Sequence, residues 1–272
     1  MPRSRTRLLF LLPLAAMAAF YLLPIYVLLI TGLKSFAEVD LSKMWRLPAG
    51  FHLDSFRAAF DALRPHFRNS LVMAIPAATI SSLLGSLNGY VLSKWRFRGA
   101  NVIFTLFLFG MFIPYQSVLI PLVLFLRRIG LYGSLPGLVL VHIVYGIPIT
   151  TLIFRNYYAT IPTDVLEAAR MDGAGILRSY WYVILPLSAP SFAVALIWQF
   201  TSIWNEFLFA IILTSPGSWP VTVELNNLAG SQIVQWNVQM AGALLAAVPT
   251  LIVYIFLGRF FLRGLMAGAI KG

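Results

Sequence analysis

A polar run at residues 199–206 holds the side chains of this chain that are best equipped for chemistry. The run contains Gln199, Thr201, Ser202, Trp204, Asn205 and Glu206. Apolar residues flank the run, so its polar groups need partners inside the protein or must line a path for a polar solute. Two interpretations stay open, namely hydrogen bonding between helices and direct contact with a substrate. Asn88 and Gln116 are weaker candidates of the same kind.

Glu206 and Trp204 suggest the most specific roles within this run. Glu206 is ionisable, so it suits either an assembly or pore-lining contact or the binding of a transported proton. Trp204, if it lies beside a cavity, offers a ring that could stack on the apolar face of a sugar. Glu206 is the one residue of the run that can carry a charge.

The rest of the sequence shows no set of residues for covalent or metal chemistry. His52, His66 and His142 lack the spacing of metal ligands, and cysteine is absent. His142 is expected to be a hydrogen-bonded packing residue, with substrate contact as the alternative. No glycine-rich loop ends in Gly-Lys-Ser/Thr, so the chain is not expected to hydrolyse ATP. We therefore expect no catalytic, cofactor or metal site, and no intramembrane enzyme.

Composition indicates that lipid is the natural solvent of this chain. It is 60% hydrophobic and 11% charged, with a mean hydropathy of +0.84, whereas soluble domains carry about 25% charged residues. The net charge of +11 is explained by basic residues that flank apolar spans. Nucleic acid is therefore not an expected partner.

Apolar stretches of membrane-spanning length predict an all-α integral membrane protein with a single transmembrane domain. A hydrocarbon core of about 30 Å needs roughly 20 residues of helix. Six stretches qualify, at about 8–32, 69–92, 102–126, 135–158, 189–213 and 241–262. The first could also be read as a signal peptide, but its apolar run reaches Ile30 and is too long for one.

The distribution of basic residues predicts that both termini are cytoplasmic. With that orientation, the inner segments hold twelve of the 20 Lys and Arg residues, including Arg3, Arg263 and Lys271. The loop 159–188 is then cytoplasmic as well.

The long outer loop 33–68 is expected to contain a short amphipathic helix on the outer face, which either caps the bundle or docks an external binding protein. Its apolar residues recur at helical spacing: Leu53, Phe56, Ala59, Phe60 and Leu63.

The cytoplasmic loop 159–188 carries a helix with clear start and stop signals. Pro162 suits a first turn, and Asp164 with Glu167 has the spacing of a capping box. Gly173, where a Cβ would obstruct the turn, then stops the helix. The loop contains Glu-Ala-Ala, three residues, Gly, nine residues and Val-Ile-Leu-Pro, from Glu167 to Pro186.

This spacing resembles the cytoplasmic "EAA" loop of ABC importer permeases. Further stretches are similar to that family: Arg68-Asn69-Ser70-Leu71, the basic turn 94–99, Ile113-Pro114, Leu119-Ile120-Pro121, Trp204-Asn205-Glu206-Phe207-Leu208 and the tail 263–272. The tail resembles the carbohydrate-uptake branch, and within it the second, six-span permease of maltose-type transporters.

The resemblance implies a half-pore that works by alternating access. It implies these partners: a second, different permease, two ATPase subunits that use the ATP, and an extracytoplasmic sugar-binding protein. It places the chain in a bacterial or archaeal plasma membrane. It assigns contact with the ATPase to Asp164, Glu167, Ala168, Ala169, Asp172, Gly173 and Pro186. The cargo implied is a sugar, oligosaccharide or polyol.

An ion- or proton-driven secondary transporter is the alternative function, with Glu206 as the coupling residue. A single carboxylate in a membrane segment is compatible with it. The loop pattern from Glu167 to Pro186, however, has no role in such a protein.

Overall fold

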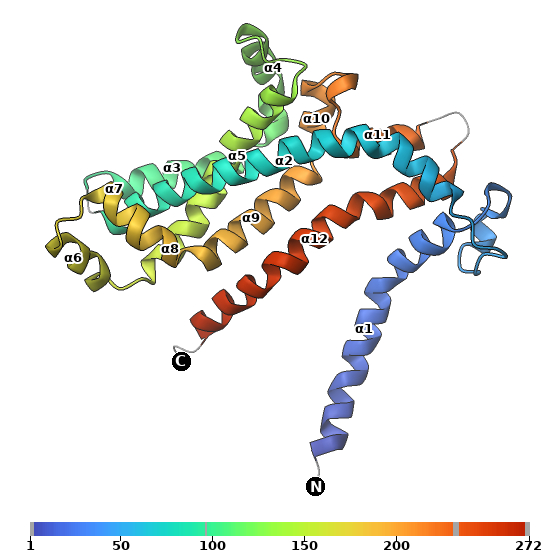
Figure 1. The fold of residues 1–272 in the computed structure, drawn as a ribbon, viewed down its shortest axis with the longest axis horizontal. Helices are drawn as coiled ribbons and strands as arrows, with labels where there is room; N and C mark the ends of the chain where they lie inside the picture. Colours follow the sequence, from blue (N-terminus) through green and yellow to red (C-terminus); the bar gives the residue numbers. More distant parts are fainter. Residues whose placement is uncertain (1–2, 96, 231–233, 270–272) are drawn as a thin grey trace. The chain divides into compact units, whose positions relative to one another are not determined.

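The chain folds into helices, as its composition predicts. The computed structural model describes residues 3–95, 97–230 and 234–269, and within these ranges it contains helices and one isolated bridge between Gly133 and Thr214 but no strand (Figure 1). The predicted all-α class is therefore confirmed.

The chain divides into two compact units, which are described separately. The first comprises Met1–Pro65 with Glu224–Val248, and the second comprises His66–Val223 with Pro249–Gly272. Three helices contribute to both units: α2 (Asp54–Lys94), α11 (Val221–Ala229) and α12 (Trp236–Ala269). The single transmembrane domain stays a prediction.

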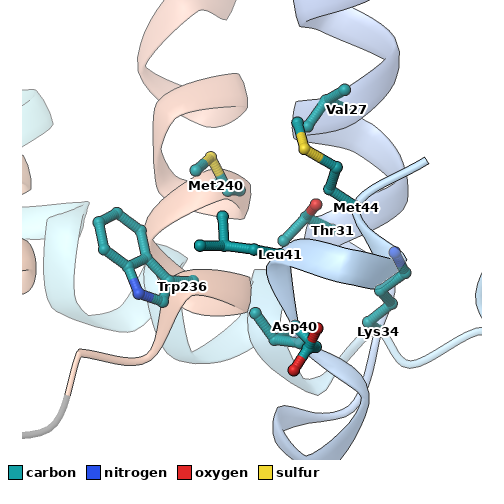
Figure 2. Close-up of a pocket in the computed structure, with 9 residues that line it drawn as sticks. Val27, Thr31, Lys34, Asp40, Leu41, Met44, Trp236 and Met240 are labelled. Atoms are coloured by element: carbon teal, nitrogen blue, oxygen red, sulfur yellow. The ribbon is translucent and has the colours of Figure 1, made fainter. Parts of the chain in front are cut away.

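The first unit joins α1 (Arg3–Gly32), two 3₁₀ turns, η1 (Phe36–Glu38) and η2 (Leu41–Lys43), and the adjoining parts of α2 and α12. Figure 2 shows a cavity of 490 Å³ lined by the end of α1, the segment 39–44 and the start of α12. The buried Lys34 donates from Nζ to the Lys43 carbonyl (2.9 Å). Asp40 accepts from the hydroxyl and the backbone N–H of Ser42, and these bonds lower the pKa of Asp40. The predicted outer loop therefore has a defined structure in its first part.

The outer amphipathic helix is not a separate element, which corrects the sequence prediction. It forms the start of α2, which runs unbroken from Asp54 to Lys94. Ala59 and Leu63 are fully buried in this part, as the periodicity predicts. Proline in a helix interior removes a backbone hydrogen bond, and Pro65 would be expected to end the helix.

Side chains just beyond Pro65 hold α2 in place. His66 Nδ1 lies 2.8 Å from the Trp219 carbonyl, Asn69 Nδ2 donates to the same carbonyl (3.0 Å), and the Ser70 hydroxyl accepts from Val221 N (2.8 Å). These bonds fasten α2 to the segment that holds η5 (Pro216–Ser218) and the start of α11. They provide the physical reason that the helix continues.

The third predicted span, 102–126, is broken. It consists of α3 (Ala100–Phe112), η3 (Tyr115–Val118) and α4 (Leu119–Arg128), and the two halves meet at 91°. Ile113 is extended (φ −71°, ψ 118°) because the following Pro114 disfavours the helical conformation. With 13 residues, α3 is about 20 Å long, which is shorter than the hydrocarbon core.

The fourth span, α5 (Leu135–Ala159), agrees with the prediction of 135–158 and packs tightly on α2. The Thr150 hydroxyl of α5 donates to the Ser81 carbonyl of α2 (2.9 Å). A Cβ on Gly85 would overlap the Thr150 side chain and come within 2.8 Å of its backbone carbonyl carbon. The absence of a side chain at Gly85 therefore sets the distance between these helices.

The fifth span is shorter than predicted and the sixth is longer. α9 (Ala189–Trp204) ends before the expected boundary at 213, and a break at 205–207 separates it from α10 (Leu208–Leu213). α12 begins at Trp236 rather than at 241 and continues to Ala269.

Before α9 lies a segment that we call the elbow, residues 176–187, built from α7 (Ile176–Ser179), the π-helix η4 (Tyr180–Ile184) and α8 (Leu185–Leu187). The elbow and α9 are bent by 78°.

Four helices of the described chain are long and apolar enough to cross a membrane. They are α1, α2, α5 and α12, and two bent pairs would raise the number to six. The pairs are α3 with the η3–α4 segment and the elbow with α9. Their number and composition indicate a multi-pass membrane protein.

The contact at Gly85 can be tested with a single methyl group. Gly85→Ala should lower the stability of the detergent-solubilised protein by about 1–3 kcal/mol, the usual cost of overpacking. Gly110→Ala is the matched control, because no atom lies within 4 Å of a Cβ there. Thermal unfolding should show a lower midpoint for Gly85→Ala alone, and equal midpoints would contradict the close approach of α2 and α5.

Candidate functional site

The helix α6 (Asp164–Met171) of the loop 159–188 begins without the predicted capping box, which is therefore a wrong prediction. Asp164 is already inside the helix, and Thr163 before it has helical dihedral angles and no side-chain cap bond. The Thr163 carbonyl accepts from Leu166 N (2.9 Å) and Glu167 N (3.0 Å). Asp164 and Glu167 are exposed in the first turn, where the helix dipole favours negative charge.

The two faces of α6 have opposite environments. Leu166 and Ala169 are buried and lie on the face of α6 that packs against the rest of the chain. The outer face carries the exposed side chains of Asp164, Glu167, Ala168 and Met171. Met171 is 89% exposed and was missed in the sequence, although it lies three and four residues after Ala168 and Glu167, on the same face.

Gly173 ends α6 in a Schellman motif. Its N–H donates to the Arg170 carbonyl, and the Ala174 N–H donates to the Ala169 carbonyl (both 2.9 Å). Gly173 has φ +78°, a conformation that side chains with a Cβ adopt only with strain. No atom lies within 4 Å of a Cβ there, so the requirement for glycine comes from the backbone and not from crowding. Asp172 and Gly173 are both exposed at this turn.

Basic residues and tyrosine fasten the loop to the end of α2. The Arg170 guanidinium lies 4.6 Å from the centre of the Trp95 ring, which is a cation–π distance. Lys94 Nζ donates to the Ile161 carbonyl (2.5 Å), and the Tyr90 hydroxyl donates to the Ile176 carbonyl (3.2 Å). These contacts hold α6 from both ends while its outer face stays exposed. Pro186, the last predicted loop residue, is exposed in α8.

The polar run 199–206 is split between the interior and the break after α9. Gln199 is 3% exposed, and its Nε2 donates to the Ser81 hydroxyl of α2 (3.2 Å). This bond joins two helices of the same chain. Asn205 caps the end of α9 by donating to the Thr201 carbonyl (2.8 Å), and its side chain is exposed.

Trp204 does not offer a face to a sugar in this structure, contrary to the hypothesis from the sequence. The side chain is 1% exposed. It stacks on Phe200 (ring centres 5.4 Å apart, 17° between planes) and on Phe67 (6.2 Å, 29°). Because aromatic side chains cover the ring, Trp204 contributes to the packing of α9 against α2.

Glu206 is a helix cap, a role that the sequence analysis missed. Its carboxylate oxygens accept the N–H groups of Phe209 (2.7 Å) and Ala210 (3.1 Å), at the start of α10. The buried His142 of α5 lies with Nε2 3.9 Å from the same carboxylate. The carbonyl of Glu206 also accepts the Thr222 hydroxyl (2.9 Å). The N–H donors at the start of a helix provide what a carboxylate needs away from water.

Asn88 and Gln116, the two weaker candidates, lie in other elements than the run 199–206. Asn88 is half-buried in α2, and Gln116 is exposed in η3, at the break of the third span. Gln116 lines a cavity of 470 Å³ with residues of α4 and with Ile212 of α10. Among the described residues, no three His, Asp or Glu side chains gather as a metal site would require.

Comparison with known proteins identifies a family. Residues 81–266 match the family described as "Binding-protein-dependent transport system inner membrane component". A probable ABC transporter permease of Pyrococcus horikoshii is 45% identical over 99% of this chain and 98% of its own length. The xylose/arabinose import permease of Haloferax volcanii is 38% identical (92% and 89%), and the glucose import system permease of Saccharolobus solfataricus is 31% identical (94% and 92%).

Solved structures share the fold. A chain of a bacterial ABC transporter involved in the import of the acidic polysaccharide alginate matches with a TM-score of 0.80 and 23% identity, over 96% of this chain and 97% of that chain. A chain of a bacterial alginate ABC transporter in complex with an alginate pentasaccharide-bound periplasmic protein matches with a TM-score of 0.69 and 18% identity, over 95% of each.

The capping role of Glu206 predicts a graded loss of stability. Glu206→Leu removes both acceptors and should lower the free energy of unfolding by about 0.5–2 kcal/mol, as other lost caps do. Glu206→Gln keeps one acceptor and should cost less. Thermal unfolding of the solubilised chain measures both changes, and Asp61→Leu, at an exposed carboxylate within α2, is the control. An unfolding midpoint of Glu206→Leu equal to that of the wild type would rule out the cap.

Proposed function

We propose that this chain, which belongs to the family of binding-protein-dependent transport system inner membrane components, forms one half of a heterodimeric pore that imports a sugar, oligosaccharide or polyol. A second, different permease forms the other half. The names of the xylose/arabinose and glucose permeases support a carbohydrate as cargo.

The observation that carries the proposal is the division of α6 into an anchored face and a free face. Leu166 and Ala169 fix the helix to the protein, and Glu167, Ala168 and Met171 remain exposed. A groove on an ATPase subunit with basic and apolar residues would complement this face, because it offers two carboxylates at the N-terminal end and a flexible apolar side chain at the other. Asp172, Gly173 and Pro186 extend the proposed contact.

The proposed mechanism is alternating access driven by two separate ATPase subunits. Closure of the two subunits on ATP draws together the α6 helices of the two permeases and rocks the pore from inward-facing to outward-facing. The α6 face must bind its ATPase in both states, since a contact that is lost in one state could not transmit the movement. This chain contributes no covalent step and needs no cofactor of its own.

The proposed topology has six spans with both termini in the cytoplasm of a bacterial or archaeal cell. The broken pair α3 with η3–α4 counts as one span, and the fifth span is the predicted stretch 189–213, which α9 and α10 share. The α6 loop then faces the ATPases, and an extracytoplasmic sugar-binding protein delivers the cargo to the opposite side. The alginate transporter solved with its periplasmic protein supports such an arrangement.

Charge reversal on the free face tests the docking of the ATPase. Glu167→Lys should detach or uncouple the ATPase while the chain still inserts, because a cation would meet the basic groove. Gly173→Asp should do the same by straining the turn at φ +78°. Copurification of the ATPase and ATP-dependent uptake into proteoliposomes are the measurements.

Two matched controls accompany these variants. Asp61→Lys reverses an exposed charge on α2, and Gly175→Asp places the same side chain at a glycine with negative φ (−73°). Both should keep the ATPase bound. Normal copurification and uptake by Glu167→Lys and Gly173→Asp would refute the docking surface.

Thiol labelling tests the topology, because the native chain has no cysteine. Single cysteines at Ser4 and at Lys271, which lies outside the described residues, should resist an impermeant thiol reagent in intact cells. A cysteine at the exposed Gly217 should react and serves as the positive control. Labelling of either terminus would overturn the six-span topology.

A further inference from the structure

Four buried hydroxyl groups form a continuous chain of hydrogen bonds close to α6, the helix proposed to bind the ATPase. The Tyr180 hydroxyl lies 2.9 Å from the Ser86 hydroxyl, which lies 2.5 Å from that of Tyr158. The Tyr158 hydroxyl lies 2.8 Å from that of Ser188, which donates to the Ile184 carbonyl (2.5 Å). Each of the four side chains is 0% exposed.

The carbonyl at the end of the chain fixes the direction of every bond. A carbonyl only accepts, so Ser188 uses its proton on Ile184 and must accept from Tyr158. Tyr158 has then used its own proton and accepts from Ser86. By the same reasoning Ser86 accepts from Tyr180. Each proton has one place, and the network therefore has one hydrogen-bonded arrangement.

The hydroxyl chain joins four elements of the protein near α6. Ser86 belongs to α2, Tyr158 to α5, Tyr180 and Ile184 to the π-helix η4, and Ser188 stands at the start of α9. Leu166, on the anchored face of α6, packs in the same buried cluster. A force on α6 therefore meets α2, α5 and the elbow at a single cluster.

A role in proton conduction does not fit this geometry. The chain ends on an amide carbonyl, which does not take up a proton near neutral pH, and it includes no carboxylate or imidazole. Packing alone does not account for it either, because apolar rings would fill the same space without the cost of burying four hydroxyls. What a fully paired buried network adds is a unique geometry.

We propose that Ser86, Tyr158 and Tyr180 are positioning residues for transport, which lock the elbow to α2 and α5 so that these elements move with α6 as one rigid body. The inference rests on the proposed docking of the ATPase on α6. The π-helix is the place that needs such a lock, because its hydrogen-bond register is less stable than that of an α-helix. Without the hydroxyl chain, the elbow could yield and absorb the movement of α6.

Removal of one oxygen tests the lock. Tyr158→Phe keeps the ring in place but leaves the Ser86 proton without its acceptor and separates α2 from Ser188. Tyr182→Phe is the matched control, since it deletes the same atom from an exposed tyrosine of the elbow. The purified complex with its ATPase, in lipid nanodiscs, is used for all variants.

The distance between α6 and α5 is the readout. Spin labels at Gly175→Cys, which lies just beyond α6 and outside the proposed contact, and at Val144→Cys, both exposed positions, report it with and without Mg²⁺ and a non-hydrolysable ATP analogue. In the wild type and in Tyr182→Phe the distance should not change with nucleotide. In Tyr158→Phe it should shift or broaden, while ATP hydrolysis persists and uptake per ATP falls several-fold.

A nucleotide-dependent change in the wild type, or none in Tyr158→Phe, would overturn the inference. If Tyr158→Phe fails to assemble, Ser86→Ala removes the bonds from α2 to both Tyr158 and Tyr180 with a smaller change and must give the shift. A purified wild-type complex that lacks an ATPase would instead refute the proposed function, and copurification detects that failure separately.

Discussion

Hydrogen bonding of the backbone at helix breaks, and of polar side chains between helices, is the constraint on which the rest of this structure depends. Hydrocarbon offers no hydrogen-bond partner, so an interrupted helix must be completed by the protein itself. After Trp204 the Glu206 carboxylate supplies the acceptors that the start of α10 needs. Between α2 and α5 the Thr150 hydroxyl bonds to a backbone carbonyl, and at the elbow four hydroxyls satisfy one another. Polar side chains that suggest a substrate path in the sequence thus serve, in large part, to hold helices together.

The same constraint explains how α6 is held within the loop 159–188. α6 has only eight residues, and an isolated helix of this length is unstable in water. Its inward side is buried, Arg170 lies on the Trp95 ring, and Lys94 holds the preceding turn. The outward face is therefore displayed by a helix that is fastened to the end of α2. This property suits a surface that receives force better than one that only binds.

Features determined by neighbouring residues could be predicted from the sequence, and features determined by distant ones could not. The bounds of α5 and the stop at Gly173 follow from local apolar periodicity and from glycine. The continuity of α2 past Pro65 depends on bonds from Asn69 and its neighbours to residues about 150 positions away. The burial of Trp204 likewise depends on Phe67, far back in the chain. The burial of Ala169 could not be predicted either, because the Glu-Ala-Ala motif does not specify which side of α6 packs against the protein.

The capping role of Glu206 also bears on the choice between an ATP-driven importer and a proton-driven carrier. A carboxylate that carries protons must exist in both forms at similar free energy. The Glu206 carboxylate oxygens accept the backbone N–H groups of Phe209 and Ala210, so a proton bound to either oxygen would weaken the cap at the start of α10. Loading and release of a proton there would thus be tied to loss of local structure. The exposed face of α6 can bind a partner without breaking any bond within the chain, and energy input at this face is therefore the better-supported route.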